Sequence, residues 1–288
     1  MLKYASLIVD IKNSRAYKQA DRIDIQKYIK ECILKLNNIF EASIKLDMIF
    51  SGGDEVQGLF YSPVVAYLYF RLFSMLIAPV QVRAGIGVGE WSIKINSGNS
   101  TEQDGPVYHN AKFAIESADD RLGYELLLYS GEKYDIFINS QINVSTLLVN
   151  KQSEYQNQLL LLTELMYPII INNAYNTKKL SQLIEIIRMK NELLYYSKWN
   201  QSRTIRQRSF SEWQIDFIEA VDIHTTINSD KSFYESAGKI RGLATKLADI
   251  TNTRRQTVEK SLKSGNIFQI RNACIVALKQ MEYHRLGV

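Results

Sequence analysis

The sequence is poor in cysteine and histidine and has no long apolar run. Only Cys32 and Cys274 occur in 288 residues, and both fall in stretches with helical apolar spacing. Two isolated thiols argue against a disulfide framework and a cysteine-based metal cluster, so we expect reduced, buried side chains in a cytoplasmic protein. The histidines are too scattered for a local zinc motif; they are His109, His224 and His284.

No segment approaches the roughly 20 apolar residues of a membrane-spanning helix. The apolar start at residues 4–9 is also too short for a signal peptide, so we expect no membrane partner. The chain carries 35 Lys and Arg against 30 Asp and Glu, a net charge of +5. This mild excess is compatible with nucleotide or nucleic-acid partners but does not require them. The length allows more than one domain.

The most informative segment is residues 48–60, where two apolar runs flank two glycines and two adjacent acids. Glycine supplies the positive φ angles of a tight turn, so the pattern predicts a hairpin with Asp54 and Glu55 at its turn. Adjacent carboxylates are poor strand formers and repel each other. A bound Mg²⁺ or Mn²⁺ would offset that repulsion. A solvated acidic turn explains the same pattern equally well.

The order of the predicted elements indicates an α+β fold with a split βαβ (ferredoxin-like) domain. Spacing and alternation predict a strand at 4–9, a helix at 21–40, a hairpin at 46–60, a helix at 63–77, a strand at 81–89, a helix at 106–118, and paired strands at 124–129 and 134–138. Helices predicted at 147–167 and 180–196 form a packing or dimerisation arm. We predict a nucleotide-binding domain at 1–140, a connecting region at 141–199 and an all-α domain at 200–288.

Residues 240–270 have the pattern of a helix-turn-helix. Leu243 and Leu247 lie on the inner face of the first predicted helix, and Thr253 is placed to cap the second. Arginine, glutamine and lysine at the start of the second helix suit contacts with phosphates and base edges in DNA. The alternatives are an amphipathic hairpin with a solvated basic face, or helices that bind protein. The candidate DNA-binding residues are Arg254, Arg255, Gln256 and Lys260.

Asp10 ends the first predicted strand, and a split βαβ sheet places that strand beside the hairpin. Asp10 and Asp54 would then be neighbours, in a geometry that suits a site for two Mg²⁺ or Mn²⁺ ions. Such ions neutralise a triphosphate and activate a hydroxyl for in-line displacement. The turn that follows opens towards a helix, and its N–H groups and basic side chains can hold phosphates. These candidate nucleotide-binding residues are Lys12, Asn13, Ser14 and Arg15.

Residues 7–11, 52–56 and 82–90 are similar in order to class III nucleotide cyclases. That family has an aspartate after the first strand, a glycine-aspartate hairpin and an Arg-x-Gly-Ile strand. Residues 52–56 also resemble the GGDEF signature of diguanylate cyclases and the palm domain of CRISPR polymerases. The resemblance implies a cyclase-type palm in which Asp10 and Asp54 hold the metals, with the Ile11 carbonyl as a further ligand and Glu55 assisting.

The same resemblance implies further contacts to a nucleoside triphosphate. Gly53 and Arg83 are candidate nucleotide-binding residues, and Asn110 and Lys112 are weaker catalytic candidates for stabilising charge in the transition state. The sequence departs from the cyclases at two places. The family carries an asparagine and an arginine on the later helix, whereas this chain has Asn110 and Lys112 in a different register and lacks the arginine. Those enzymes have a purine-recognising lysine just before the hairpin glycine, where this chain has Phe50 and Ser51.

Most of the chain is similar to the SatD family. The resemblance rests on residues 10–15, Arg22 with Gln26, 53–58, 85–90 and 104–106, and on the C-terminal helix-turn-helix after residues 213–214. It implies a cyclase-like palm fused to a DNA-binding-type module. One hypothesis is a homodimeric enzyme that converts an NTP into a cyclic mono- or oligonucleotide second messenger. The alternative is a degenerate palm that senses a nucleotide and regulates transcription.

Overall fold

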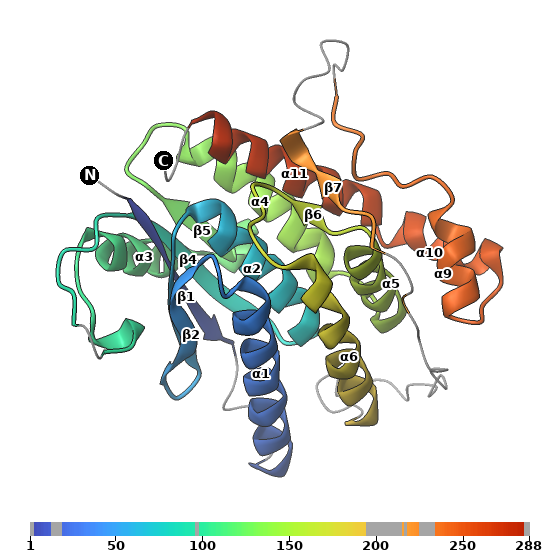
Figure 1. Cartoon of the computed structure of the whole chain (residues 1–288), viewed down its shortest axis with the longest axis horizontal. Coiled ribbons are helices and arrows are strands. Elements are labelled where there is room, and N and C mark those ends of the chain that lie inside the picture. The colour runs from blue at the N-terminus through green and yellow to red at the C-terminus, as the bar shows by residue number, and fades with distance from the viewer. Residues whose placement is uncertain are drawn as a thin grey trace.

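The structure, a computed structural model, describes residues 3–12, 19–95, 98–193, 215, 218–224 and 234–284. Its first part contains β1 (Tyr4–Ile11), α1 (Gln19–Phe40), β2 (Ile44–Gly52), β3 (Glu55–Phe60), α2 (Pro63–Ile77), β4 (Val82–Gly89), α3 (Pro106–Ser117) and β5 (Leu126–Tyr129). Short 3₁₀ turns at Ser100–Glu102 and Asp120–Leu122 flank α3. The order of strands and helices predicted up to residue 129 is confirmed (Figure 1).

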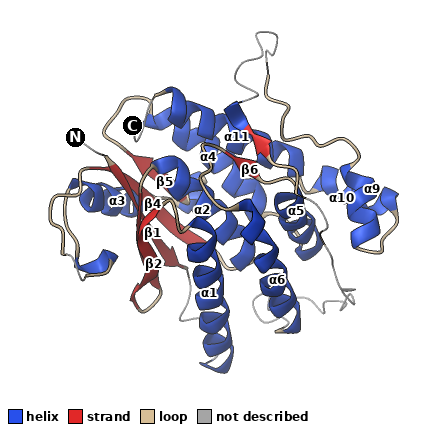
Figure 2. Cartoon of the chain, in the orientation of Figure 1, coloured by secondary structure: helices blue, strands red, loops and turns tan. Residues whose placement is uncertain are grey.

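The second part is mainly helical. It contains α4 (Asp135–Asn150), α5 (Glu154–Met166), β6 (Ile169–Ile170), a 3₁₀ turn (Thr177–Ser181), α6 (Gln182–Glu192), β7 (Val221–Asp222), α9 (Leu243–Ile250), α10 (Arg255–Ser264) and α11 (Ile267–Tyr283). Figure 2 shows the main sheet on one side of the molecule and helices filling the other. The mixed α/β class is therefore confirmed, while the ferredoxin-like split and the helix-turn-helix stay predictions.

The main sheet has the strand order β2-β3-β1-β4-β5. β1 lies in the middle and pairs antiparallel with both β3 and β4, whereas β5 runs parallel to β4. The N-terminal strand thus lies beside the hairpin, as predicted. This arrangement brings the C-terminal end of β1 next to the turn between β2 and β3.

The two faces of the sheet are covered by different helices. Leu7 and Val9 point into the main core together with side chains of α1 and α2, while Ile8 packs against Ala111 and Ile115 of α3 on the opposite face. The glycines of β4 let α3 approach closely, since a Cβ on Gly87 would lie 2.0 Å from the Ala111 nitrogen. Successive side chains on a strand alternate between faces. Asp10 therefore shares the α3 face with Ile8.

The outer edge of β5 is covered by two amide side chains of α4. Asn143 donates to the Leu126 carbonyl at 2.8 Å and accepts from its N–H at 3.4 Å. Asn139 makes the same pair of hydrogen bonds with Leu128, at 2.8 and 2.7 Å. Four residues of helix rise about 6 Å and two residues of strand about 6.7 Å, so the two spacings match. The amides take the place of a sixth strand.

Two sequence predictions in the central region are wrong. Residues 134–138 begin helix α4 rather than forming a strand; Asp135 accepts hydrogen bonds from the N–H and hydroxyl of Ser130, and Ile138 and Ile142 enter the core at helical spacing. Four of these five residues are aromatic or β-branched, which is typical of a strand, and the helical spacing becomes visible only over a longer window. The helix predicted at 147–167 is broken, because Ser153 caps a new helix, α5.

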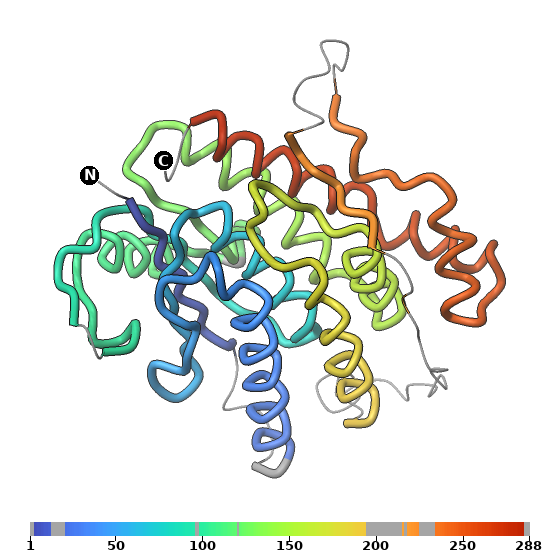
Figure 3. Tube along the Cα trace, in the orientation of Figure 1, coloured from blue at the N-terminus to red at the C-terminus, as the bar shows by residue number. Residues whose placement is uncertain are grey.

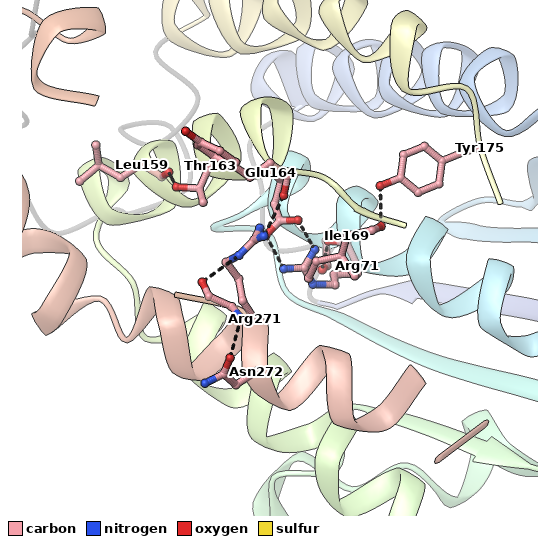
Figure 4. Close-up of polar contacts among 11 residues, drawn as sticks. Arg71, Leu159, Thr163, Glu164, Ile169, Tyr175, Arg271 and Asn272 are labelled. Atoms are coloured by element: carbon pink, nitrogen blue, oxygen red, sulfur yellow. Dashed lines mark hydrogen bonds and ion pairs between the residues drawn. The ribbon is translucent and has the colours of Figure 1, made fainter. Parts of the chain in front are cut away.

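A cluster of buried charges joins three helices that are far apart in sequence (Figure 4). Arg71 of α2 donates two hydrogen bonds to Glu164 of α5, at 2.6 and 2.7 Å. Arg271 of α11 also donates to Glu164, and its other nitrogens donate to the carbonyls of Tyr167 at 2.7 Å and Gly238 at 3.3 Å. None of the three charged side chains is more than 4% exposed. We call Arg71, Glu164 and Arg271 the charge triad.

The triad and one apolar core link all three predicted domains. The core cluster includes residues of β1 and α2, of α5 and α6, and of α9 to α11. Figure 3 shows the trace of α11 running alongside α4, and these helices pack together. The predicted boundaries near residues 140 and 199 stay a prediction.

Both cysteines are free and buried, as predicted. Burial raises the pKa of the Cys32 thiol to about 12, so it stays protonated at neutral pH. No helix within the described ranges has both the length and the apolar character that crossing a bilayer requires.

Candidate functional site

The candidate site is built around Asp10, at the C-terminal end of β1. Asp10 pairs directly with Glu55 of β3 on one side and with Arg83 of β4 on the other. Directly opposite residues in a sheet point to the same face, so the three side chains form a row across three strands. We call this row, together with Asp54 in the adjacent turn, the acidic row. The Arg83 guanidinium donates to the Asp10 carboxylate at 3.2 Å. The predicted metal ligand thus already has a cationic neighbour.

The β2–β3 turn carries the second acid, Asp54, to the same end of β1. Gly53 has a φ of +63°, which a side chain would make unfavourable, and this explains the glycine at the tip. The Asp54 carbonyl accepts a hydrogen bond from the N–H of Ile11 at 3.2 Å, which ties the turn to the strand end. Ser51 donates to the Glu55 carboxylate at 2.6 Å and orients it. The predicted proximity of Asp10 to the hairpin is present.

The electrostatics of this strand end favour a bound cation. The pKa of Asp10 is raised, first because burial disfavours its charge and also because Asp54 and Glu55 add negative charge; the Arg83 guanidinium opposes the shift. A carboxylate with a raised pKa is held in an environment that does not fully balance its charge. A divalent cation would supply the missing balance.

The acids at this strand end are oxygen donors of the kind that Mg²⁺ or Mn²⁺ binds. Mg²⁺ in proteins is commonly held by one or two carboxylates, with water and substrate phosphates as the other ligands. Asp10 and Asp54 offer two carboxylates, and the Ile11 carbonyl is the next acceptor along β1. Among the described residues, no group of three or more His, Cys, Asp or Glu side chains is placed to hold a metal ion. A metal site at Asp10 and Asp54 therefore stays a prediction.

The predicted phosphate-binding turn is only partly described. The Lys12 ammonium lies 3.5 Å from a carboxylate oxygen of Glu125, and both side chains are mostly buried. Lys12 would have to leave Glu125 to reach a phosphate. Asn13, Ser14 and Arg15 lie outside the described residues.

Asn110 and Lys112 are not near Asp10. Asn110 donates to the Val88 carbonyl at 2.8 Å, and Val88 lies at the other end of β4 from Arg83. At about 3.3 Å per residue the two positions are about 16 Å apart. Lys112 is exposed in the middle of α3, directly after Ala111, which packs against Gly85 and Gly87. Within one chain, neither side chain joins the acidic row.

The predicted DNA-binding residues lie on α10, where Arg254, Arg255, Gln256 and Lys260 are all exposed. Val258 and Leu262 point into the core, as predicted. The predicted cap at Thr253 is wrong, because Arg254 occupies the N-cap position and makes no side-chain capping bond. Figure 1 places α9 and α10 at the far right, well away from the β2–β3 hairpin at the lower left.

Sequence reasoning missed two sets of polar residues. The charge triad was overlooked, although Arg71 is the single charge of an apolar helix and Glu164 follows a run of four leucines; a charge in such a position is a usable signal. The amides of Asn139 and Asn143 were also overlooked. Their spacing of four residues becomes meaningful only once the strand they face is known.

Comparison with known proteins gives a family and distant structural matches. A bacterial light-regulated adenylyl cyclase is matched at a TM-score of 0.32 and 17% identity, over 44% of this chain and 75% of that one. No curated protein matches the chain. The family model of the SatD family matches residues 4–193. This match spans the sheet, the acidic row and the helices up to α6, and the chain belongs to the SatD family.

Proposed function

We propose that this protein binds a nucleoside triphosphate with Mg²⁺ or Mn²⁺ at the end of β1, and that it is a nucleotide cyclase-like protein making a cyclic nucleotide product. The observation that carries the proposal is the placement of Asp10 beside the Asp54–Glu55 turn. Two strands far apart in sequence deliver these acids to one sheet end, and the pKa of Asp10 is raised there. The proposal includes the split βαβ palm predicted from the sequence.

Each residue of the row has a role in this proposal. Asp10 and Asp54 hold the metal, which would balance charge on the triphosphate and lower the pKa of an attacking hydroxyl. Glu55, oriented by Ser51, adds negative potential beside them. Arg83 is 41% exposed, so its side chain can turn from Asp10 to a phosphate oxygen when a metal takes over the carboxylate. The metal ion would then replace the Arg83 guanidinium as the cation beside Asp10, so the negative charge of the carboxylate would stay balanced.

Mutation of Asp54 tests the proposal. We expect at least one of the four NTPs to bind in the presence of Mn²⁺ and to yield a cyclic product detectable by mass spectrometry. Asp54→Asn should weaken that binding about 100-fold, because a neutral amide is a poor ligand for a hard cation. Asp47→Asn is the control, since Asp47 is an exposed acid on the same hairpin.

Two results would separate binding from catalysis. Mn²⁺-dependent binding without product would favour the sensing hypothesis over the enzyme. The metal–nucleotide site itself would be refuted if no NTP bound, or if Asp54→Asn bound as tightly as Asp47→Asn.

A second proposed activity is DNA binding through α10, which would make the protein a nucleotide-responsive regulator. The supporting observation is the exposure of Arg254, Arg255, Gln256 and Lys260 together on α10 and at its start. Surface cations of this kind bind phosphates and release counterions. Because α10 lies well away from the acidic row, DNA and a nucleotide could bind at the same time.

Replacing Arg254 and Arg255 together by alanine should weaken DNA binding and reduce the slope of log affinity against log salt by about two. The control is Lys27→Ala with Lys30→Ala, which removes the same charge from an exposed face of α1. Fluorescence anisotropy with duplex DNA over a range of salt concentrations measures both effects. Equal losses in the two double variants would indicate a general charge effect and refute a specific role for α10.

A further inference from the structure

Around β5 lies an exposed apolar surface that the nucleotide site does not use. Helix α4 packs against α11 and β5, but another stripe of its surface faces outward. Ile136 is 65% exposed, Phe137 62%, Val144 47% and Leu147 41%. At 100° per residue these four side chains fall within about 100° of the helix circumference. They form one stripe rather than scattered exposures.

Two neighbouring segments extend the stripe. Leu122, 72% exposed, lies in the 3₁₀ turn before Gly123, and a Cβ on Gly123 would lie 4.0 Å from the Leu147 side chain. On the other side of β5, Phe113 of α3 is 53% exposed and packs edge-on against Tyr129 with ring centroids 4.7 Å apart. We call the whole surface the α4 face; its members are Phe113, Leu122, Ile136, Phe137, Val144 and Leu147.

The α4 face is large enough to form the apolar centre of a protein interface. With about 180 Å² for a fully exposed large side chain, the exposed fractions of these six residues give roughly 600 Å² of apolar surface. That is at the upper limit for a single apolar patch on a monomer, about 300–600 Å². A standard interface buries about 800 Å² on each partner, and a polar rim around this face would supply the difference.

The charges around the α4 face favour a second copy of this chain as the partner. Lys112 and Glu116 are exposed beside Phe113, and Glu132 and Lys133 are exposed just before α4. A two-fold axis places the same surface on both sides of the contact, so a rim of one sign would repel its copy. Here an acidic residue and a basic residue lie close together at each place, so the rim of one copy can form ion pairs with the same rim of the second copy.

The covered edge of β5 constrains how the two copies meet. Asn139 and Asn143 already occupy the outer N–H and C=O groups of β5. Pairing of β5 with β5 of a second chain is therefore blocked, and contact must be made by side chains of α4 and its neighbours. We propose that the α4 face is the interface of a symmetric homodimer built by apolar side-chain packing. This proposal is independent of whether the acidic row binds a nucleotide.

Surface substitutions test the dimer without disturbing the core. Sedimentation equilibrium of the wild-type chain should show a concentration-dependent dimer, and Phe137→Glu should raise its dissociation constant at least about tenfold, because the charge would be buried in the contact. Leu34→Glu is the matched control: Leu34 is 51% exposed on α1 and lies outside the α4 face. We expect it to dimerise like the wild type.

Hydrogen exchange locates the contact directly. Amides of residues 135–148 in the wild type should exchange more slowly as the protein concentration rises, and this protection should be absent in Phe137→Glu. A wild-type chain that stays monomeric at concentrations up to about 100 μM would overturn the proposal, since an interface of this area normally associates below that range. Equal dimerisation of Phe137→Glu and Leu34→Glu would also overturn it.

Discussion

Replacing Glu164 by glutamine is expected to lower the free energy of unfolding by about 3–5 kcal/mol, a large part of the stability of a domain. The reason is the position of Glu164 between Arg71 and Arg271. Burial alone raises the pKa of Glu164, but the charges of Arg271 and Arg71 outweigh it and hold that pKa below its usual value. Without the carboxylate, two guanidinium groups remain buried with no anion between them.

Urea unfolding followed by circular dichroism measures the loss. Glu185→Gln is the control, because Glu185 is 69% exposed in its contact with Lys35 and should change stability by less than about 0.5 kcal/mol. Replacing the whole triad, with Arg71→Met, Glu164→Leu and Arg271→Met, should recover much of the stability lost in Glu164→Gln, since apolar groups need no partner. If Glu164→Gln lowered the free energy of unfolding by less than about 1 kcal/mol, the triad would not stabilise the packing of α2, α5 and α11.

Replacing Asp10 by asparagine should have opposite effects on binding and on stability. Mn²⁺-dependent nucleotide affinity should fall about 100-fold, as expected when a carboxylate ligand is lost. The unfolding free energy at neutral pH should stay equal or rise. A carboxyl group with a raised pKa contributes stability below its unfolded pKa of about 3.9 and loses that contribution as pH rises through the folded pKa. The ionised form therefore opposes folding, and asparagine removes that opposition.

The pH dependence of binding in the wild type gives a second test of the role of Asp10. Metal competes with the proton for Asp10, so the nucleotide affinity of the wild type should decline as pH is lowered through the raised pKa of this group. Calorimetric titrations with Mn²⁺ and an NTP at a series of pH values measure this decline. A large loss of stability in Asp10→Asn, with binding unchanged, would mean that Asp10 serves the sheet and not a ligand.

The sequence was sufficient to predict the acidic site because local rules govern it. Glycine at the turn and the apolar run of β1 are signals over a few residues that mark the two acids. The order of the first elements, typical of a split βαβ sheet, then predicts that β1 lies beside the hairpin. The contacts that were missed connect distant segments. Arg71 and Arg271 are 200 residues apart in sequence, and no local pattern shows that both meet Glu164. Residues 134–138 were misread for the same reason, since their helix is selected by packing against α11.

The amide ladder of Asn139 and Asn143 has a consequence for how this protein behaves when concentrated. Exposed strand edges are the usual starting points of amyloid-like growth, because their free backbone groups recruit strands from other molecules. Here one end of the sheet is saturated by side chains. The opposite end, β2, is irregular in its register with β3 and exposes Lys45 and Asp47, which also discourages recruitment. Both edges of the main sheet therefore resist the addition of a strand from another molecule. At high protein concentration we expect discrete, reversible association rather than fibrils.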